Sequence, residues 1–254
     1  RLLAPGHAGC RNPKWVRHIS IAAQASELDS GSRLDRHFAP DISWDEHLKH
    51  IDPELKHTSR VNVDQGPVIQ TLPVQSIVCT PEDHAVLSGD VDTIHIKGVA
   101  YSGAGRGVCR VEISIDGGIT FTAADLLKPC VGAACAPGTP PPEAGQGRNW
   151  SWQQYGLSLP LPQSVISRLR KGEKVQLEII SKATDGDFNT QPRDVDSIWN
   201  VLGICVNHWS RSRVTLDPAV KPGEEPPPPE QPKAGDWRWP HEHPEMAEEA
   251  AKKK

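Results

Sequence analysis

The middle of the chain alternates apolar and polar residues in short runs, a period typical of half-buried β-strands. In the clearest run, Cys109–Ile115, apolar and polar residues alternate throughout, and Thr93–Gly98, Lys174–Ala183 and Trp209–Leu216 show the same period. Turn-forming residues separate the runs, and the helical crossovers that parallel strands need are not visible. About seven such strands predict an immunoglobulin-like antiparallel β-sandwich over residues 68–217, so the fold class is mainly β.

Local signals predict the remaining elements. Asp116-Gly117-Gly118 follows the clearest strand, and Asp-Gly accommodates the positive φ of a two-residue hairpin turn. A returning strand is therefore expected at Ile119–Ala123. Residues 128–148 are rich in Pro, Gly and Ala and predict a loop. Outside the sandwich, one helical turn is expected near Trp44–Ile51 and a short strand at Ile19–Ile21.

These patterns divide the chain into four parts. Residues 1–30 are interpreted as the end of a domain that begins upstream, since the chain does not start with methionine. Residues 31–67 show no sustained period and are predicted to be a linker. Residues 68–217 form the sandwich. Residues 218–254 contain a polyproline-like stretch, which cannot pack as a core element, and are interpreted as a disordered tail.

Composition and charge narrow the classes of partner. The formal net charge of −4 supplies no positive field along a phosphate backbone, so no nucleic-acid partner is expected. No apolar run approaches the roughly 20 residues that cross a bilayer, so no membrane partner is expected either. Six scattered cysteines are too few for a disulfide scaffold in 254 residues. The sequence contains no complete catalytic or metal-binding set, and we assign no catalytic or metal residue.

Ordered blocks within the predicted sandwich carry a resemblance to a known family. The longest is Tyr101–Gly118, and Trp150-Ser151-Trp152 is similar to a tryptophan pair of that family. Later blocks follow in the family's order: Lys182–Asp185, Asn189–Pro192, Ile198–Asn200 and Trp209–Arg211. Together they resemble the dimerisation domain of the eukaryotic molybdenum oxidoreductases, the sulfite oxidase and nitrate reductase family. The resemblance implies a homodimer mediated by the sandwich.

The first residues resemble the last part of the molybdopterin-binding domain of the same family, an α+β domain. The matching stretches are Arg1–Gly6 and Gly9–Trp15. The resemblance implies that Arg1, Asn12 and Lys14 bind the cofactor, at the pterin and its phosphate. A dianionic phosphate suits such donors, since arginine offers a planar fork and lysine a point charge. The alternative is a solvated basic stretch without a ligand.

The resemblance also implies a function for a longer parent protein. The parent would be a sulfite oxidase-like enzyme that holds molybdenum-molybdopterin, with heme as a further candidate cofactor, and oxidises sulfite, a small inorganic anion, to sulfate. The molybdenum-ligating cysteine of the family lies upstream of these residues, so the fragment is expected to be inactive alone. The implied compartment is the mitochondrial intermembrane space.

Two alternatives remain open. In sulfite oxidases the Trp-Asn-Leu block is followed by an arginine that reaches the anion pocket, whereas Leu202 follows Trp199-Asn200-Val201 here. Nitrate reductases also place an apolar residue there, so a nitrate reductase-type molybdenum enzyme is the first alternative. The second is a stand-alone immunoglobulin-like binding module, which would have no use for the basic segment before it.

Overall fold

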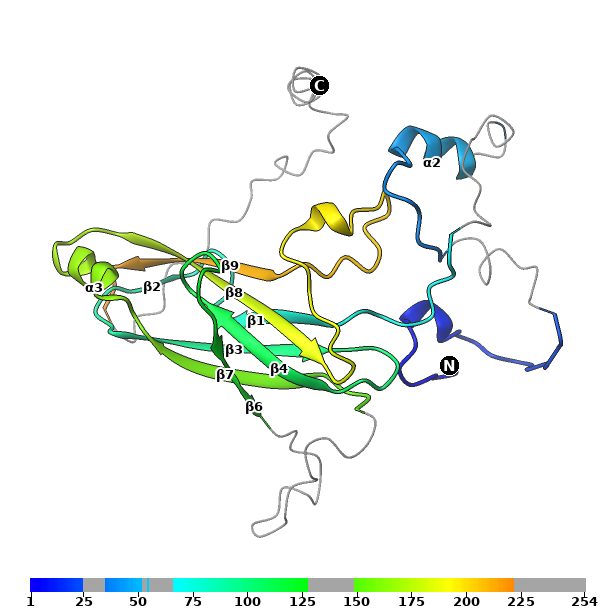
Figure 1. Ribbon diagram of the computed structural model, residues 1–254, viewed down its shortest axis with the longest axis horizontal. Coiled ribbons are helices and arrows are strands. Elements are labelled where there is room, and N and C mark those ends of the chain that lie inside the picture. The colour runs from blue at the N-terminus through cyan, green and yellow to red at the C-terminus, as the bar shows by residue number, and fades with distance from the viewer. Residues whose placement is uncertain (25–34, 52–53, 55–65, 128–148, 222–254) are drawn as a thin grey trace, which may run out of the picture.

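The computed structural model describes residues 1–24, 35–51, 54, 66–127 and 149–221, and within them two β-sheets pack face to face (Figure 1). The four-stranded sheet has the order β1 (Gln75–Thr80), β3 (Thr93–Tyr101), β7 (Gln153–Pro160), β6 (Asp125–Leu127). The five-stranded sheet has the order β2 (Val86–Ser88), β9 (Ser210–Asp217), β8 (Val175–Asp185), β4 (Val108–Ser114), β5 (Thr122–Ala123). Short helices complete the described elements: η1 (Gly9–Arg11), α2 (Trp44–Ile51), α3 (Gln163–Arg170) and η5 (Val195–Ser197).

The predicted immunoglobulin-like sandwich is confirmed. Its described strand pairs are antiparallel, except that β2 pairs in parallel with β9. The sequence did not predict β2, because three residues are too few to show a period. The helical turn near Trp44–Ile51 is also confirmed as α2. No helix in the described part of the chain is long and apolar enough to cross a bilayer.

The core lies between the sheets and follows the alternation of the strands. On β3, Ile94, Ile96 and Ala100 are buried, while the residues between them face outward. Tyr155 is the largest fully buried side chain, and its hydroxyl donates to Ile77 O at 3.0 Å. Burial raises the pKa of Tyr155 to about 12, so the hydroxyl keeps its proton and this bond at neutral pH.

The helix α3 closes one end of the sandwich, and the sequence pattern did not predict it. It begins after Pro162, buries Leu169 and packs Val165 and Ile166 against the core. These three positions have helical spacing, i, i+1 and i+4, and lie on one face. Eight residues in two turns gave too short a pattern to detect beside the strand period of Leu157, Leu159 and Leu161. Figure 1 shows α3 at the end of the sandwich opposite the N-terminal segment.

The predicted two-residue hairpin turn at Asp116-Gly117-Gly118 is wrong. Strand β4 ends at Ser114 and Ile113 pairs with Thr122, so residues 115–121 form a longer connection, and the returning strand β5 is only Thr122–Ala123. The Asp116 carboxylate accepts hydrogen bonds from Ile119 N at 3.1 Å and Thr120 N at 3.0 Å. Hydrogen bonds from Ser114 and Thr120 lower the pKa of Asp116, which therefore holds the loop as a carboxylate.

This loop folds over the outer face of the five-stranded sheet. Phe121 packs edge-on against Trp209 with ring centroids 5.2 Å apart, and Lys182 Nζ lies 4.0 Å from the Phe121 centroid. Gly118 has φ +84°, and a Cβ there would lie 2.8 Å from the Trp209 ring. A Cβ added to the neighbouring Gly117 (φ +76°) would instead meet no atom of the described residues within 4 Å. The loop is thus a lid on this face, and only Gly118 is held against it.

Three further predictions have different outcomes. The strand expected at Ile19–Ile21 is wrong: the segment is not a strand, and Ile19 and Ile21 are exposed. The loop predicted for residues 128–148 lies outside the described residues. The predicted tail also lies outside them from residue 222 onward, as does much of the predicted linker, so those domain boundaries stay predictions.

We expect Gly118→Ala to destabilise the protein more than Gly117→Ala. Both substitutions force alanine into positive φ, which costs about 1 kcal/mol. Only at position 118 must the Trp209 ring also move, which adds a further penalty of about 1 kcal/mol or more. Urea denaturation monitored by tryptophan fluorescence measures both free energies of unfolding. Equal losses for the two variants would contradict packing of the loop on Trp209.

Candidate functional site

The N-terminal segment folds into a closed loop. Leu2 N donates to Pro13 O at 3.1 Å, which brings the two ends of the loop together. The Asn12 side chain lies inside the loop, where its Oδ1 accepts from Ala4 N and its Nδ2 donates to Ala8 O at 3.0 Å. Closure therefore places residue 1 beside residues 13 and 14, which are distant along the segment.

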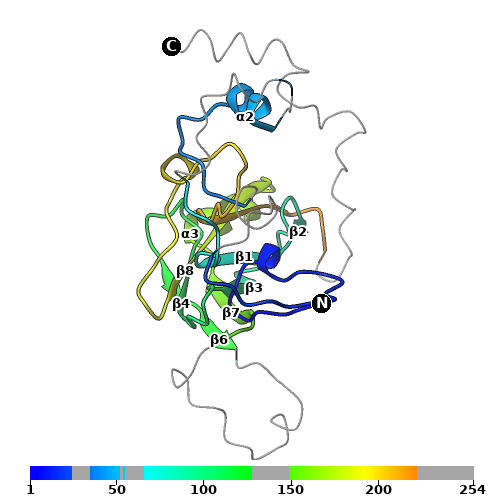
Figure 2. The same cartoon turned by 90° about the vertical axis from the view of Figure 1, so that its right-hand side faces the viewer.

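This loop docks on one end of the sandwich, as Figure 2 shows. Ala104 N donates to Gly6 O at 2.8 Å, and Ala8 N donates to Gln70 O at 2.9 Å. Arg11 Nε donates to Ile69 O at 2.7 Å. Gly6 has φ +81° and lies so close to the Trp150 ring that a Cβ would overlap it. The docking thus needs glycine at position 6 for both conformation and space.

The structure separates the three predicted cofactor ligands into two kinds. Arg1 and Lys14 are exposed at the closed end of the loop, and neither forms an ion pair with a described residue. Lys14 Nζ lies 5.8 Å from the ring centroid of its neighbour Trp15. Asn12 instead uses both ends of its amide within the loop. A guanidinium and an ammonium group are donors that suit a phosphate, and the Asn12 amide holds the loop whose closure brings the backbones of residues 1 and 14 near each other.

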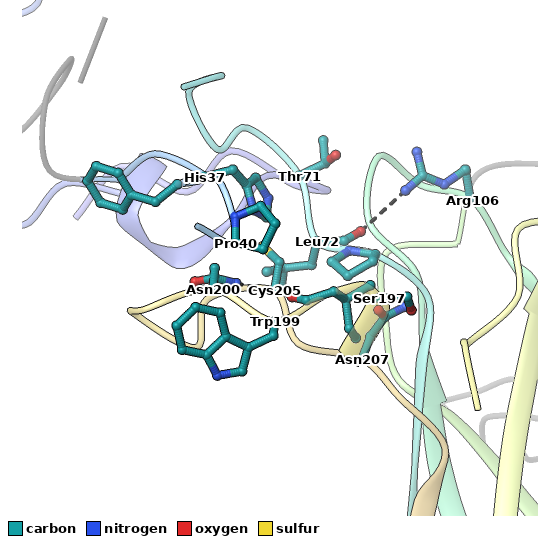
Figure 3. A pocket seen from close by; sticks show the side chains of 13 residues that line it. His37, Pro40, Thr71, Leu72, Arg106, Ser197, Trp199, Asn200, Cys205 and Asn207 are labelled. Carbon is teal, nitrogen blue, oxygen red and sulfur yellow. Dashed lines mark hydrogen bonds between the residues drawn. The ribbon is translucent and has the colours of Figure 1, made fainter. Parts of the chain in front are cut away.

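A pocket of about 480 Å³ lies close to this loop, between the sandwich and the segments that precede it (Figure 3). Three stretches of the chain and Arg106 line it, and the residues of those stretches are His37, Phe38, Pro40, Thr71, Leu72, Pro73, Ser197, Ile198, Trp199, Asn200, Cys205 and Asn207. Burial, with a smaller contribution from Cys10, raises the pKa of the Cys205 thiol. A protonated thiol is a poor nucleophile and a poor metal ligand. In the described part of the chain, no three histidine, cysteine or acidic side chains group as metal ligands.

The Asn200 side chain, which lines the pocket, also holds the loop of residues 200–204 beside it. Asn200 Nδ2 donates to Ile204 O at 2.9 Å, and Ile204 N donates to Asn200 Oδ1 at 3.1 Å. This pair closes the loop and places Leu202, which is partly buried, at its tip. Trp199, which precedes Asn200, is 43% exposed and therefore lies at the surface and not in the core. The tip is apolar where the resemblance expects an arginine in sulfite oxidases.

Arg106 links this pocket to the sandwich. Its Nε lies 3.0 Å from Asp185 Oδ2, and its guanidinium donates to Leu72 O at 3.3 Å. Asp185 is fully buried and also accepts from Ser102 Oγ at 2.7 Å. Burial acts to raise the pKa of Asp185, but hydrogen bonds from Ser102 and Asn189 outweigh it and the pKa is lowered. The carboxylate therefore stays ionised at neutral pH.

The sequence alone did not single out Arg106, Asp185 or Asn200 as positioning residues. All three lie within the blocks that carry the family resemblance, at Tyr101–Gly118, Lys182–Asp185 and Ile198–Asn200. That coincidence was the one signal that pointed to them. The pairing itself could not be inferred, because Arg106 and Asp185 are 79 residues apart in sequence.

The fold and the site define an immunoglobulin-like sandwich domain with a basic loop docked on one end. The chain belongs to the Mo-co oxidoreductase dimerisation domain family, whose sequence model matches residues 66–217. Membership implies molybdopterin in the parent protein.

Individual relatives agree with this assignment. The chain is 33% identical over 219 residues to the mitochondrial sulfite oxidase of Mus musculus, covering 86% of this chain and 33% of the relative. It is 28% identical over 220 residues to an NADH nitrate reductase of Solanum lycopersicum, covering 85% of this chain and 21% of the relative. The chain thus spans about a third or less of the length of these relatives.

A solved structure supports the fold independently. The sulfane dehydrogenase SoxCD from Paracoccus pantotrophus superposes with a TM-score of 0.55 at 18% identity. The match covers 85% of this chain and 44% of that one. At this level of identity the similarity concerns the fold.

We expect Asp185→Asn to lower the free energy of unfolding by about 3 kcal/mol, because it leaves a buried guanidinium contact without its counter-charge. The lowered pKa of Asp185 means that its ionised form stabilises the fold above the ordinary aspartate value of 3.8. This contribution is lost as the pH falls below that value. The stability gap between wild type and Asp185→Asn should therefore narrow between about pH 5 and about pH 3. Urea titrations at several pH values measure it.

The neighbouring Asp187 provides the control, because its side chain is exposed in the same turn. Asp187→Asn should leave stability within about 0.5 kcal/mol of wild type. A gap between wild type and Asp185→Asn that stays constant with pH would contradict the ionised, buried pair.

Proposed function

We propose that this chain is part of a sulfite oxidase-like molybdenum oxidoreductase, in which the sandwich holds two copies of the enzyme together. The observation that supports this best is the docked N-terminal loop. Its sequence resembles the end of a cofactor-binding domain, and the loop is fitted to the sandwich through Gly6, Ala8 and Arg11. A stand-alone binding module would need no such loop, so this alternative is disfavoured.

Arg1 and Lys14 would hold the phosphate of the molybdopterin, and Asn12 would keep them adjacent. Each amide nitrogen carries two hydrogens, so Asn12 Nδ2 has one donor left beyond its bond to Ala8 O. When bound in the parent, the molybdenum cofactor supplies oxygen-atom transfer to or from a small oxyanion. The residues of this chain contribute positive charge and a fixed spacing between the donors.

Sulfite is the proposed substrate, since relatives named sulfite oxidase match at up to 34% identity. A nitrate reductase-type enzyme is the second candidate, and Leu202 is the observation that favours it. An apolar tip on the loop closed by Asn200 offers no charge to an anion. A mitochondrial compartment is proposed only by analogy with relatives whose names carry that word. Heme in the parent is likewise a proposal by analogy.

The substrate assignment is tested with the full-length parent. We expect the purified, molybdenum-loaded enzyme to oxidise sulfite with a suitable electron acceptor and to reduce nitrate at least tenfold more slowly. Metal content is measured by elemental analysis and turnover by steady-state assays. Nitrate turnover that exceeds sulfite turnover would instead establish the nitrate reductase-type alternative.

We expect Lys14→Ala in the same parent to weaken cofactor retention at least tenfold. A charge-assisted hydrogen bond contributes about 1.5 to 3 kcal/mol, which corresponds to a change of that size. The readout is the molybdopterin released on dilution, so it does not depend on turnover. Arg17→Ala is the matched control, because Arg17 is an exposed cation of the same stretch outside the closed loop. Equal losses for both variants would contradict a specific phosphate contact at Lys14.

A further inference from the structure

The chain turns back directly after its last described strand. β9 runs from Ser210 to Asp217 and ends at the α3 end of the sandwich (Figure 1). Val220 N then donates to Asp217 O at 3.1 Å, and Ala219 N donates to Asp217 Oδ1 at 2.9 Å. A hydrogen bond from residue i+3 to residue i closes a turn. The chain that continues from Lys221 is therefore directed back along the sandwich.

The outer side of β8 and β9 presents two aromatic rings surrounded by cations. We call this surface the β9 face and define it by Phe121, Glu178, Lys182, Arg193, Trp209, Arg211 and Arg213. The Trp209 and Phe121 rings are partly exposed and pack edge-on. Lys182 Nζ lies 5.7 Å, and the guanidinium carbons of Arg193 and Arg211 lie 6.0 Å, from the centroid of the Trp209 ring. The β9 face therefore combines an aromatic platform with positive charge.

Carboxylates pair most of these cations, but Arg213 is left over. The pairs are Lys182 with Glu112 at 3.5 Å, Arg211 with Glu178 at 2.9 Å and Arg193 with Asp194 at 3.7 Å. Arg213 is exposed and forms no ion pair with a described residue, and the Asp83 carboxylate beside it binds its backbone N–H at 2.7 Å. Since Arg213 lies four residues along the strand from Trp209, this guanidinium is about 13 Å from the aromatic platform.

The segment that follows the turn has a composition that suits such a surface. Residues 222–232 lie outside the described residues, and their sequence contains six prolines, three glutamates and no basic residue. Consecutive prolines favour an extended helix, which is preorganised and binds aromatic surfaces at a low cost in conformational entropy. The glutamates stand on both sides of Pro226–Pro229, where their carboxylates can pair with guanidinium and ammonium groups.

We infer that residues 222–232 bind to the β9 face of their own chain. This inference is independent of the proposed enzymatic function. The turn holds Val220 beside Asp217, so the segment starts at the α3 end of the face and runs antiparallel to β9. Glu224 and Glu225 bind Arg213, the prolines cover the face toward the Trp209 ring, and the last glutamate of the segment reaches Lys182.

The lengths of the segment and of the strand agree with this arrangement. At about 3.1 Å per residue, Glu225 lies about 12 Å from Lys221, and Arg213 lies about 13 Å from Asp217 along β9. On the same scale Glu230 lies about 28 Å from Lys221, and Trp209 lies about 26 Å from Asp217. The acidic and basic residues are thus spaced alike along the two paths.

The test is carbodiimide cross-linking of the 254-residue chain, which joins carboxylates to lysines in direct contact and is mapped by peptide mass spectrometry. We expect Glu230 to couple to Lys182, with the Lys182–Glu112 product as the internal reference. Lys97 and Lys171 are more exposed than Lys182 and should not couple to Glu230. A mixture of isotope-labelled and unlabelled chains shows whether both coupled groups come from one chain.

Substitutions distant from the coupled groups test the charge contacts. Glu224→Gln combined with Glu225→Gln, and separately Arg213→Gln, should each lower the yield of the Glu230–Lys182 product about two- to fivefold, as expected for exposed ion pairs. The matched control is Glu248→Gln combined with Glu249→Gln, a second glutamate pair later in the chain, which should leave the yield unchanged. An equal loss in this control would overturn the inference. So would coupling of Glu230 spread evenly over the lysines, coupling only between different chains, or formation of the reference product alone.

Discussion

The rest of the structure depends on the hydrogen bonds and the ion pair that the buried carboxylate of Asp185 accepts. A lone carboxylate in a protein interior costs several kcal/mol, so it persists only with excellent partners. Here it accepts from Ser102, from Arg106 and from the backbone and side chain of Asn189. Arg106 in turn holds Leu72, at the start of the sandwich. One charge therefore fixes the end of β8, the segment before β4 and the chain entering β1.

The docked loop is built on this fixed end. Ala104 lies between Ser102 and Arg106, and its backbone N–H donates the hydrogen bond to Gly6 O that docks the loop. Gly186 N also donates to Gly107 O at 2.8 Å, which ties the turn after Asp185 to the same segment. The geometry that sets Arg1 beside Lys14 is thus supported by a charge network inside the sandwich. The sandwich can thus shape the segment that is proposed to contact a cofactor.

Short sequence patterns predicted the elements whose structure depends on neighbouring residues in the chain. The alternation of apolar and polar residues predicted β3, β4, β8 and β9, because every second residue of a half-buried strand faces the core. The Asp-Gly dipeptide predicted a tight turn, but Asp116 caps a longer loop whose shape depends on Trp209, almost a hundred residues away. A contact between residues so far apart cannot be predicted from a short window of sequence. The same holds for α3, which is recognisable mainly by the core that it covers.

The residues of the candidate site were also predicted only in part from the sequence. Family resemblance predicted Arg1 and Lys14 as cofactor ligands, and the structure adds that both are exposed at the end of a loop closed between Leu2 and Pro13. It could not show that the Asn12 amide is bonded inside the loop, because that depends on how the chain closes between Leu2 and Pro13. Nor could it find Arg106 and Asp185, whose partnership exists only after the sheets have packed.

The glycine beneath Trp150 has a thermodynamic consequence. Because bonds from Gly6 O to Ala104 N and from Ala8 N to Gln70 O join the basic loop to the sandwich, folding of that end of the sandwich stabilises the docked, closed loop. Any ligand that selects the closed loop must then also favour the folded sandwich, by an amount that grows with the logarithm of its concentration. Ligand binding to the loop and folding of the sandwich are therefore linked equilibria. The melting temperature of the sandwich should rise as the ligand occupies the loop.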